Sequence, residues 1–348
     1  MKLRRLLSWS AVFLVSLMVT ISCTPSQPSS STSNPSSPAP AVTSEPVRLG
    51  FSAWPGWFPW QVAEEEGLFE ANNVNVELTW FDGYLDSINA LAAGQLDANS
   101  QTLNDTISSV SGGADLVIVL TNDNSTGNDK IIAAEGINSI EDLRGRRVAA
   151  EEGTVDHFLL LLGLEQAGMT QDDIEFQPLE TGAAAAAFVA GQVDAVGVFA
   201  PFTTRALERP GSQELFSSAD FPGSISDHLV VSRQMVEQRP NDVQALVNTW
   251  FATLSTITQE GDKALDTMSK RAGVTLDEYK EYDAGTTIFD IDDNLQAMQP
   301  GNDMTSLPYA AEQISNFLVQ SGLAPEAPDL SNLFDDRFIQ TYAESTPS

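Results

Sequence analysis

Short apolar runs alternate with helix-like patterns from residue 47 onward. Strands are expected over 47–51 and 75–80, and helices over 61–69 and 86–93. The series ends in Gly94-Gln95-Leu96-Asp97-Ala98. Strands that alternate with helices predict a parallel sheet, with ligand-contacting loops outside the carboxyl ends of its strands.

A second copy of this series follows in the next part of the chain. Strand and helix patterns recur between residues 147 and 190, and Gly191-Gln192-Val193-Asp194-Ala195 closes the copy 97 residues after the first closing segment. Residues 227–232 then form a strand pattern that we expect to return to the first unit. The aspartates of the two closing segments, Asp97 and Asp194, are expected to hold turns.

The duplication predicts an α/β fold of two hinged lobes that face each other across a cleft. Lobe 1 is predicted to contain residues 46–130 and 229–348, and lobe 2 residues 131–228. The loops after the first strand of each lobe are expected to line the cleft.

The N-terminus has the pattern of an export signal. An apolar stretch from Leu6 to Ile21 follows a basic start and is shorter than the ~20 residues of a transmembrane helix. Cys23, the only cysteine, lies at the expected cleavage point, where bacterial lipoproteins carry their lipid. We predict a lipoprotein signal over 1–22, a Ser/Pro-rich tether over 23–45 and a periplasmic, lipid-anchored protein. The alternative is a plain secretory signal with a chance cysteine.

The chain is strongly acidic, with 48 Asp and Glu residues against 17 Lys and Arg and a formal net charge of −31. This charge argues against nucleic acid or an anionic membrane surface as a partner, since both would repel the chain. One cysteine excludes an internal disulfide framework and a zinc cluster. The histidines, His157 and His228, lack neighbours with ligand-type spacing, and no nucleophile motif is present. We therefore expect no catalytic residue, no cofactor and no metal.

Several motifs resemble those of ABC-importer solute-binding proteins. They are Ser52-Ala53-Trp54-Pro55-Gly56-Trp57 after the first strand, Ala63-Glu64-Glu65-Glu66-Gly67-Leu68-Phe69, and Asp142-Leu143-Arg144-Gly145 before the second copy. Over residues 46–320 the chain resembles the nitrate, sulfonate, taurine and thiamine-precursor binding family. The resemblance implies a type II periplasmic-binding-protein fold and a monomer that delivers a small solute to permease and ATPase subunits.

A narrower resemblance concerns the loops expected to line the cleft. Trp80-Phe81-Asp82, Asn104-Asp105 and the segments 123–129 and 152–157 are similar to those of binding proteins from urea-carboxylase-type operons, which resemble guanidine carriers. This resemblance implies a guanidine-type solute and a role in nitrogen uptake.

The chemistry of the same loops also favours a cation. The loops carry seven carboxylates, and Lys130 is the only nearby cation. Such a cleft repels nitrate or a sulfonate and attracts guanidinium, which stacks on aromatic faces and donates paired hydrogen bonds to a carboxylate. The seven are Asp82, Asp105, Asp123, Asp129, Glu151, Glu152 and Asp156. We expect two or three to contact the solute and the others to cap helices or lie at the surface.

The candidate ligand-binding residues combine these acids with aromatic and amide side chains. They are Trp54, Trp57, Asp82, Asn104, Asp105, Asp123, Glu152 and Asp156. For Trp57, capping the edge of the sheet is an equal alternative to solute contact.

Other functions stay open at this point. The same kind of importer protein could bind an anion such as nitrate, taurine or another sulfonate. The chain could also be a thiamine-precursor-related enzyme of the same fold, although the export signal and the missing nucleophile argue against it. A sensory or adhesion lipoprotein is the third alternative, and operon context would decide.

Overall fold

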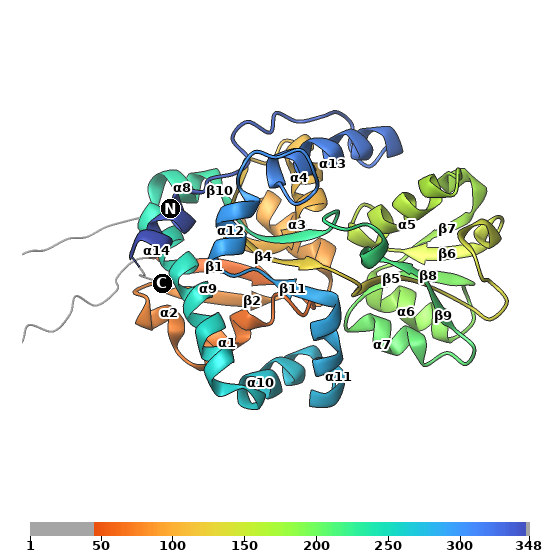
Figure 1. Ribbon diagram of the computed structural model, residues 1–348, viewed down its shortest axis with the longest axis horizontal. Helices are drawn as coiled ribbons and strands as arrows, with labels where there is room; N and C mark the ends of the chain where they lie inside the picture. The colour runs from red at the N-terminus through yellow and green to blue at the C-terminus, as the bar shows by residue number, and fades with distance from the viewer. Residues whose placement is uncertain (1–44, 346–348) are drawn as a thin grey trace, which may run out of the picture. The chain divides into compact units, whose positions relative to one another are not determined.

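Two β-sheets organise residues 45–345, which are the residues that the computed structural model describes (Figure 1). The first sheet contains β1 (Val47–Phe51), β2 (Val76–Trp80), β3 (Ala98–Thr102), β4 (Leu116–Ser125), β10 (Ser226–Ser232) and β11 (Thr286–Ile288). The second contains β5 (Asp129–Ala133), β6 (Arg147–Ala150), β7 (Glu175–Pro178), β8 (Ala195–Phe199) and β9 (Gln213–Ser217). The predicted signal peptide, Cys23 and the predicted tether up to residue 44 lie outside the described residues.

The two sheets repeat one topology. In the first, β2, β1 and β3 are parallel, and β10 follows antiparallel to both β3 and β4. In the second, β7, β6 and β8 are parallel, and β5 follows antiparallel to both β8 and β9. Each antiparallel strand arrives from the other sheet, because β5 follows β4 in the chain and β10 follows β9. The prediction of a duplicated α/β unit with a returning strand is confirmed.

Each unit contains an equivalent Arg–Asp pair at the start of its first strand. Arg48 on β1 donates from its backbone N and its Nε to Asp97 Oδ2, at 2.9 and 3.0 Å. Arg147 on β6 donates from the same two atoms to Asp194 Oδ2, at 3.1 and 3.2 Å. The prediction that both aspartates hold turns is confirmed, and their arginines are thereby engaged at the ends of β1 and β6 opposite the cleft-forming loops.

Helices cover both sheets. Those nearest the second sheet are α5 (Val155–Gln166), α6 (Thr181–Val189) and α7 (Phe202–Leu207) (Figure 1). The others are α1 (Pro59–Glu65), α2 (Leu68–Ala71), α3 (Tyr84–Ala92), α4 (Leu103–Ser111), α8 (Arg233–Gln238), α9 (Pro240–Glu260), α10 (Asp262–Ala272), α11 (Leu276–Glu281), α12 (Ile291–Ala297), α13 (Leu307–Ser321) and α14 (Arg337–Ser345). Within residues 45–345, no helix has both the length and the apolar character needed to cross a bilayer.

The core of the first unit lies between its sheet and the helices α1 and α9. Trp60 and Trp250 are fully buried there, with ring centroids 4.9 Å apart. Trp60 Nε1 donates to Ser100 Oγ on β3 at 2.9 Å, which satisfies its polar atom inside the core. A separate apolar cluster around Phe188 and Val196 fills the second unit between α6 and β8.

Two chain crossings join the units, between β4 and β5 and between β9 and β10. They touch each other, because Ser125 Oγ lies 2.7 Å from Ser218 Oγ and Ser125 N donates to Ile225 O at 2.9 Å. Asn128 in the first crossing also donates through Nδ2 to Tyr282 O at 2.7 Å. The crossings run beside the cleft, so residues at their ends belong to both the hinge and the site.

Candidate functional site

The loop at the carboxyl end of β1 carries two tryptophans into the space between the sheets. Trp54 and Trp57 are only 3% and 2% exposed, and a tight turn holds them, with Trp57 N donating to Trp54 O at 3.0 Å. Trp54 Nε1 donates to Asp123 Oδ1 on β4 at 2.9 Å. The indole is thereby fixed against the first sheet and meets Phe199 of the second at 6.3 Å between ring centroids.

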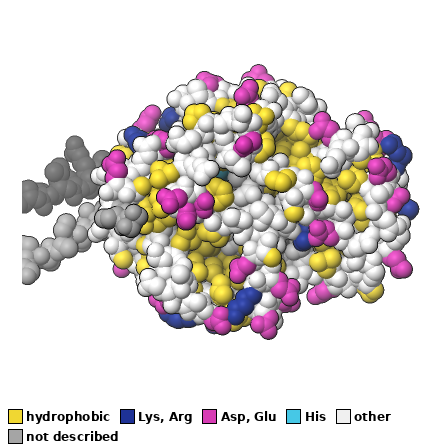
Figure 2. All heavy atoms as spheres, in the orientation of Figure 1, with side chains coloured by type: hydrophobic (Ala, Val, Ile, Leu, Met, Phe, Trp, Pro, Cys, Tyr) yellow, Lys and Arg dark blue, Asp and Glu magenta, His cyan; other side chains and the backbone are white. Residues whose placement is uncertain are grey.

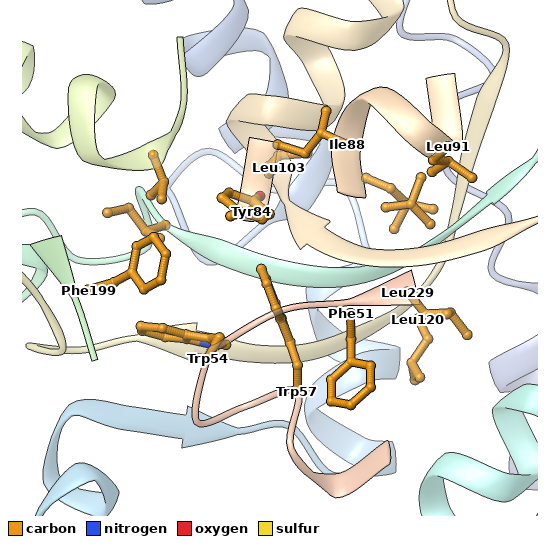
Figure 3. Close-up of a cluster of buried hydrophobic side chains, with 14 of the residues drawn as sticks. Phe51, Trp54, Trp57, Tyr84, Ile88, Leu91, Leu103, Leu120, Phe199 and Leu229 are labelled. Atoms are coloured by element: carbon orange, nitrogen blue, oxygen red, sulfur yellow. The ribbon is translucent and has the colours of Figure 1, made fainter. Parts of the chain in front are cut away.

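Four aromatic rings enclose a small cavity (Figure 3). Trp57 packs on Tyr84 with ring centroids 5.2 Å apart, and Tyr84 meets Phe199 at 6.0 Å. The cavity has a volume of about 10 Å³, enough for the centre of roughly one water-sized sphere. Its lining is Ala53, Trp54, Trp57, Tyr84, Thr102, Asp129, Val155, Phe199, Ile225 and Asp227.

The strand ends explain why these residues converge. Asp227 on β10 lies between Thr102 on β3 and Asp123 on β4, as the register of both antiparallel pairs shows. On the second sheet, Asp129 on β5 pairs with Phe199 on β8. The carboxyl ends of β1, β3 and β8 thus meet the beginnings of β5 and β10, which is the edge where open α/β sheets bind ligands.

Acidic side chains are concentrated and buried around this cavity. Six carboxyl groups, each at most 5% exposed, come from six different places in the fold: Asp105, Asp123, Asp129, Glu151, Asp156 and Asp227. None of them belongs to an ion pair with Lys or Arg among the described residues, whose pairs lie elsewhere. Lys130, the nearest base along the chain, is paired with Glu214. Surface acids, by contrast, are spread over the visible face (Figure 2).

Several of these carboxyl groups have an oxygen without a hydrogen-bond partner. Such buried oxygens are Asp123 Oδ2, Asp129 Oδ2, Asp156 Oδ1 and Asp227 Oδ2. Buried acceptors are normally satisfied, and of these four carboxyl groups Asp129 and Asp227 line the cavity, where a donor would reach them. Asp105 differs, because Thr102 Oγ1 and Asn104 Nδ2 donate to its two oxygens at 2.8 and 2.7 Å.

Burial dominates the electrostatics of the cluster. Desolvation raises the pKa of Asp105, Asp123, Asp129 and Glu151 to about 7. It raises the pKa of Asp156 and Asp227 well above the ordinary value, and repulsion from neighbouring carboxylates adds to the effect. Burial therefore favours the protonated, uncharged form of each of these groups.

The hydroxyl group of Thr181 also indicates, from geometry alone, that one of its two neighbouring carboxyl groups is protonated. Thr181 Oγ1 lies 2.7 Å from Asp156 Oδ2 and 3.1 Å from Glu151 Oε2. A hydroxyl has one hydrogen to donate, so the second carboxyl satisfies this contact only by carrying a proton itself.

The structure brings most of the expected residues together. Trp54 and Trp57 line the cavity, Asp123 holds Trp54, and Asp105 and Asp156 belong to the buried acid cluster. Asn104 is buried beside Asp105, and its Oδ1 has no partner.

Two of the expected residues lie elsewhere. Asp82 is exposed and accepts a hydrogen bond from Trp80 Nε1 at 2.7 Å, which turns it away from the cavity. Glu152 is exposed and lines a surface hollow together with Glu151 and Glu180. Exposed carboxylates keep their water, so neither has the unmet demand for a cation that marks the buried group.

Tyr84, Phe199 and Asp227 are among the cavity residues that were not sequence candidates. Tyr84 is the first residue of α3 and belongs to no motif. Phe199 is the last residue of an ordinary apolar strand, and Asp227 lies near the start of the returning strand. Only Asp227 had a usable signal, since an acid at the start of a buried apolar strand is unusual.

Gly56 leaves no room for a side chain. A Cβ at this position would lie 1.8 Å from Asp123 Oδ2, which it would displace. We expect Gly56→Ala to lower the free energy of unfolding by about 1–3 kcal/mol, the usual cost of overpacking a buried site. Denaturant unfolding measures this change.

Gly112→Ala is the matched control. The nearest atoms to a Cβ there lie at 3.3 and 3.5 Å, so the free energy of unfolding should change by less than about 1 kcal/mol. Equal stability of the wild type and Gly56→Ala would contradict this tight packing, because the loop around Trp54 would then accommodate the added methyl group without cost.

Metal coordination is a different matter from cation binding in general. Across residues 45–345, no group of three or more His, Cys, Asp or Glu side chains has an arrangement that could hold a metal ion.

Residues 54–264, more than half of the chain, match the family described as NMT1/THI5 like. A Brucella abortus protein provisionally described as a binding protein is 32% identical over 208 residues, 58% of this chain and 64% of its own length. An Escherichia coli protein provisionally described as aliphatic sulfonates-binding is 26% identical over 299 residues, 84% of this chain and 90% of its own. The chain thus spans less than two thirds of the Brucella relative that it matches.

Among solved structures, the alkanesulfonate-binding protein SsuA from Xanthomonas axonopodis, bound to MOPS, has a TM-score of 0.72 to this chain. The two are 19% identical, and the match covers 84% of this chain and 100% of that one. At this identity the likeness shows the fold, which is the predicted two-lobed type II periplasmic-binding-protein fold.

Proposed function

Because the chain belongs to the NMT1/THI5-like family, we propose that it is the solute-binding component of an ABC importer and that its solute is a small cation, guanidinium. The observation that carries the proposal is the cavity walled by four aromatic rings, with Asp129 and Asp227 in its lining and four more buried carboxyl groups beyond them, none of the six ion-paired within residues 45–345. Relatives described as binding proteins support the general role.

Guanidinium suits this cavity in shape and in bonding. It is planar and weakly hydrated, so it can stack on one aromatic face such as that of Trp54 or Trp57, whose rings are tilted by 58° to each other. Its N–H groups can donate to the free oxygens of Asp129 and Asp227, which line the cavity. The cavity as it stands has room for about one water-sized sphere, so even a solute of a few heavy atoms requires the units to separate before it enters.

The helix N-termini beside the cavity also favour a cation. A helix N-terminus ordinarily attracts an anion through its free N–H groups and its dipole. Here the chain supplies its own carboxyl groups in that place, with Asp105 in the first turn of α4 and Asp156 in the first turn of α5. An anionic solute would compete with these groups and meet the other acids of the cluster.

One observation favours the anion alternative, a sulfonate or nitrate. Trp57 Nε1 is buried without a hydrogen-bond acceptor and lies at the cavity. Relatives described as sulfonate- or taurine-binding support this alternative as well. A single donor against several free acceptors makes it the second candidate.

We propose further that lobes formed by residues 46–130 with 229–348, and by 131–228, close on the solute about the two crossings. Hinge closure is the common response of such folds, and Phe199 of the second sheet already meets Trp54 and Tyr84 of the first unit. The protein would act as a monomer without catalysis, held at the cell envelope by lipid on Cys23 and passing its solute to permease and ATPase subunits.

Calorimetry of residues 45–348 against guanidinium, urea, agmatine, taurine and nitrate tests the proposal. We expect saturable heat from guanidinium and far weaker binding of urea, which has the same shape without the charge. Nitrate has the shape with the wrong sign and should give no heat. Tight binding of taurine or nitrate together with no heat from guanidinium would establish the anion alternative.

A further inference from the structure

Asp123 and Asp227 face each other across the pairing of β4 and β10. They are direct partners in the antiparallel register, and both are at most 1% exposed. Side chains directly opposite in such a pair have Cβ atoms about 4.5–5.5 Å apart, so two negative charges there repel strongly. The pair needs a positive charge or a proton between its two carboxyl groups.

No element that the structure describes supplies that positive charge. The titratable groups that face the pair are Tyr84 on α3, Asp105 on α4, Asp129 on β5 and Tyr279 on α11, with Glu151 and Asp156 of the second unit further out. All of these are acids. On β10 itself, His228 lies against Ser226 Oγ at 2.9 Å, and burial lowers its pKa to about 3, so it is neutral. Trp54 contributes an uncharged N–H.

A proton shared between the two carboxyl groups would relieve this repulsion. Burial and the neighbouring carboxylates raise the pKa of Asp227 well above its ordinary value. Trp54 Nε1 donates to Asp123 Oδ1 and thereby stabilises the ionised form of Asp123, so Asp227 is the side that carries the proton. Asp123 Oδ2 and Asp227 Oδ2 have no hydrogen-bond partner among the described residues, and Asp227 lines the cavity.

We propose that the Asp123–Asp227 pair determines which solutes the site accepts, by taking a monovalent cation in exchange for the proton that the two carboxyl groups share. The inference rests on the proposed function, which supplies the cation. The O–H bond of Asp227 breaks, its proton leaves to bulk water, and the new carboxylate accepts N–H hydrogen bonds from the solute. One positive charge leaves and one arrives, so the buried pair keeps its net charge.

This exchange gives a rule for selectivity. Urea brings no charge, so it cannot replace the proton and must leave the pair as it is. An anion would add a negative charge to a site that already needs a proton to hold two carboxyl groups together. The site then selects a solute by the charge that it brings to Asp227 as well as by the shape that it presents to the aromatic rings.

Titration of the wild type with guanidinium chloride, at pH 6 in two buffers of different ionisation enthalpy, measures the protons released. We expect close to one proton per bound guanidinium, and an affinity that rises with pH by up to about tenfold per pH unit. Asp227→Asn cannot release that proton. Its titration at pH 6 should release about one proton fewer than that of the wild type, and its affinity at pH 8 should be at least about tenfold lower.

The outcomes separate the two proposals. Guanidinium binding by the wild type with no proton release and a constant affinity would overturn the exchange and leave the proposed function standing. No heat at any pH from a folded wild type would overturn the proposed function itself. Asp172→Asn, an exposed acid in the second unit, should keep the wild-type profile, and its loss there would overturn the assignment to the pair. The wild-type measurement decides the matter even where Asp227→Asn does not fold.

Discussion

Asp123→Asn is expected to weaken guanidinium binding by about 2–5 kcal/mol, thirtyfold or more in Kd. Asp123 lies at 0% exposure, holds Trp54 through Oδ1 and has a free Oδ2. The amide can still accept the Trp54 hydrogen bond, so the aromatic wall stays in place while a desolvated cation loses a charged partner. Calorimetry at pH 8 measures the change.

Asp82→Asn is the control for this result. Asp82 belongs to the same group of loop carboxylates, but it is exposed and engaged with Trp80 Nε1. Its amide variant should bind guanidinium within about twofold of the wild type, as for surface substitutions. A large loss of affinity in Asp82→Asn, with none in Asp123→Asn, would show that guanidinium binds at the exposed loops and not at the buried cavity.

The solute-free protein is expected to lose stability as pH rises from about 4 to 7, the reverse of the usual trend in this range. Burial raises the pKa of Asp105, Asp123, Asp129 and Glu151 to about 7 in the folded state, against ordinary values near 4 in the unfolded chain. Between these values the folded state binds more protons. Each such group therefore favours the folded state fully below its unfolded pKa, and this contribution is lost as pH rises to the folded value.

Thermal unfolding between pH 5 and 8 measures this trend. A loss in the free energy of unfolding of up to ~1.4 kcal/mol per group and pH unit should lower the Tm by several degrees. Guanidinium at millimolar concentration should raise the Tm again by part of this amount. Asp97 and Asp194 act in the opposite direction, since pairing with arginine lowers their pKa, but their effect is confined to pH values below about 4. Asp227→Asn should reduce the slope. A Tm that is constant or rises from pH 5 to 7 would contradict the buried acid cluster.

The repeated pattern of the sequence determined the fold and part of the site. Alternation of strands and helices, and the two Gly-Gln-x-Asp-Ala segments, define units whose topology is the same in both sheets. Because loops at the carboxyl ends of strands must meet at one edge, Trp54, Trp57, Asp105 and Asp123 could be expected there from local order alone. The shortage of basic residues in these loops already favoured a cation.

The tertiary structure decided which acids face the cavity and in what state. Asp227 comes opposite Asp123 only because β10 returns antiparallel to β4, a pairing between distant parts of the chain. Asp82 and Glu152 share the composition of the other loop acids and differ from them in exposure. Residue type and spacing report local geometry, whereas desolvation depends on every element packed around a group. A carboxyl group therefore becomes a cation site or a surface charge through contacts that its own segment does not encode.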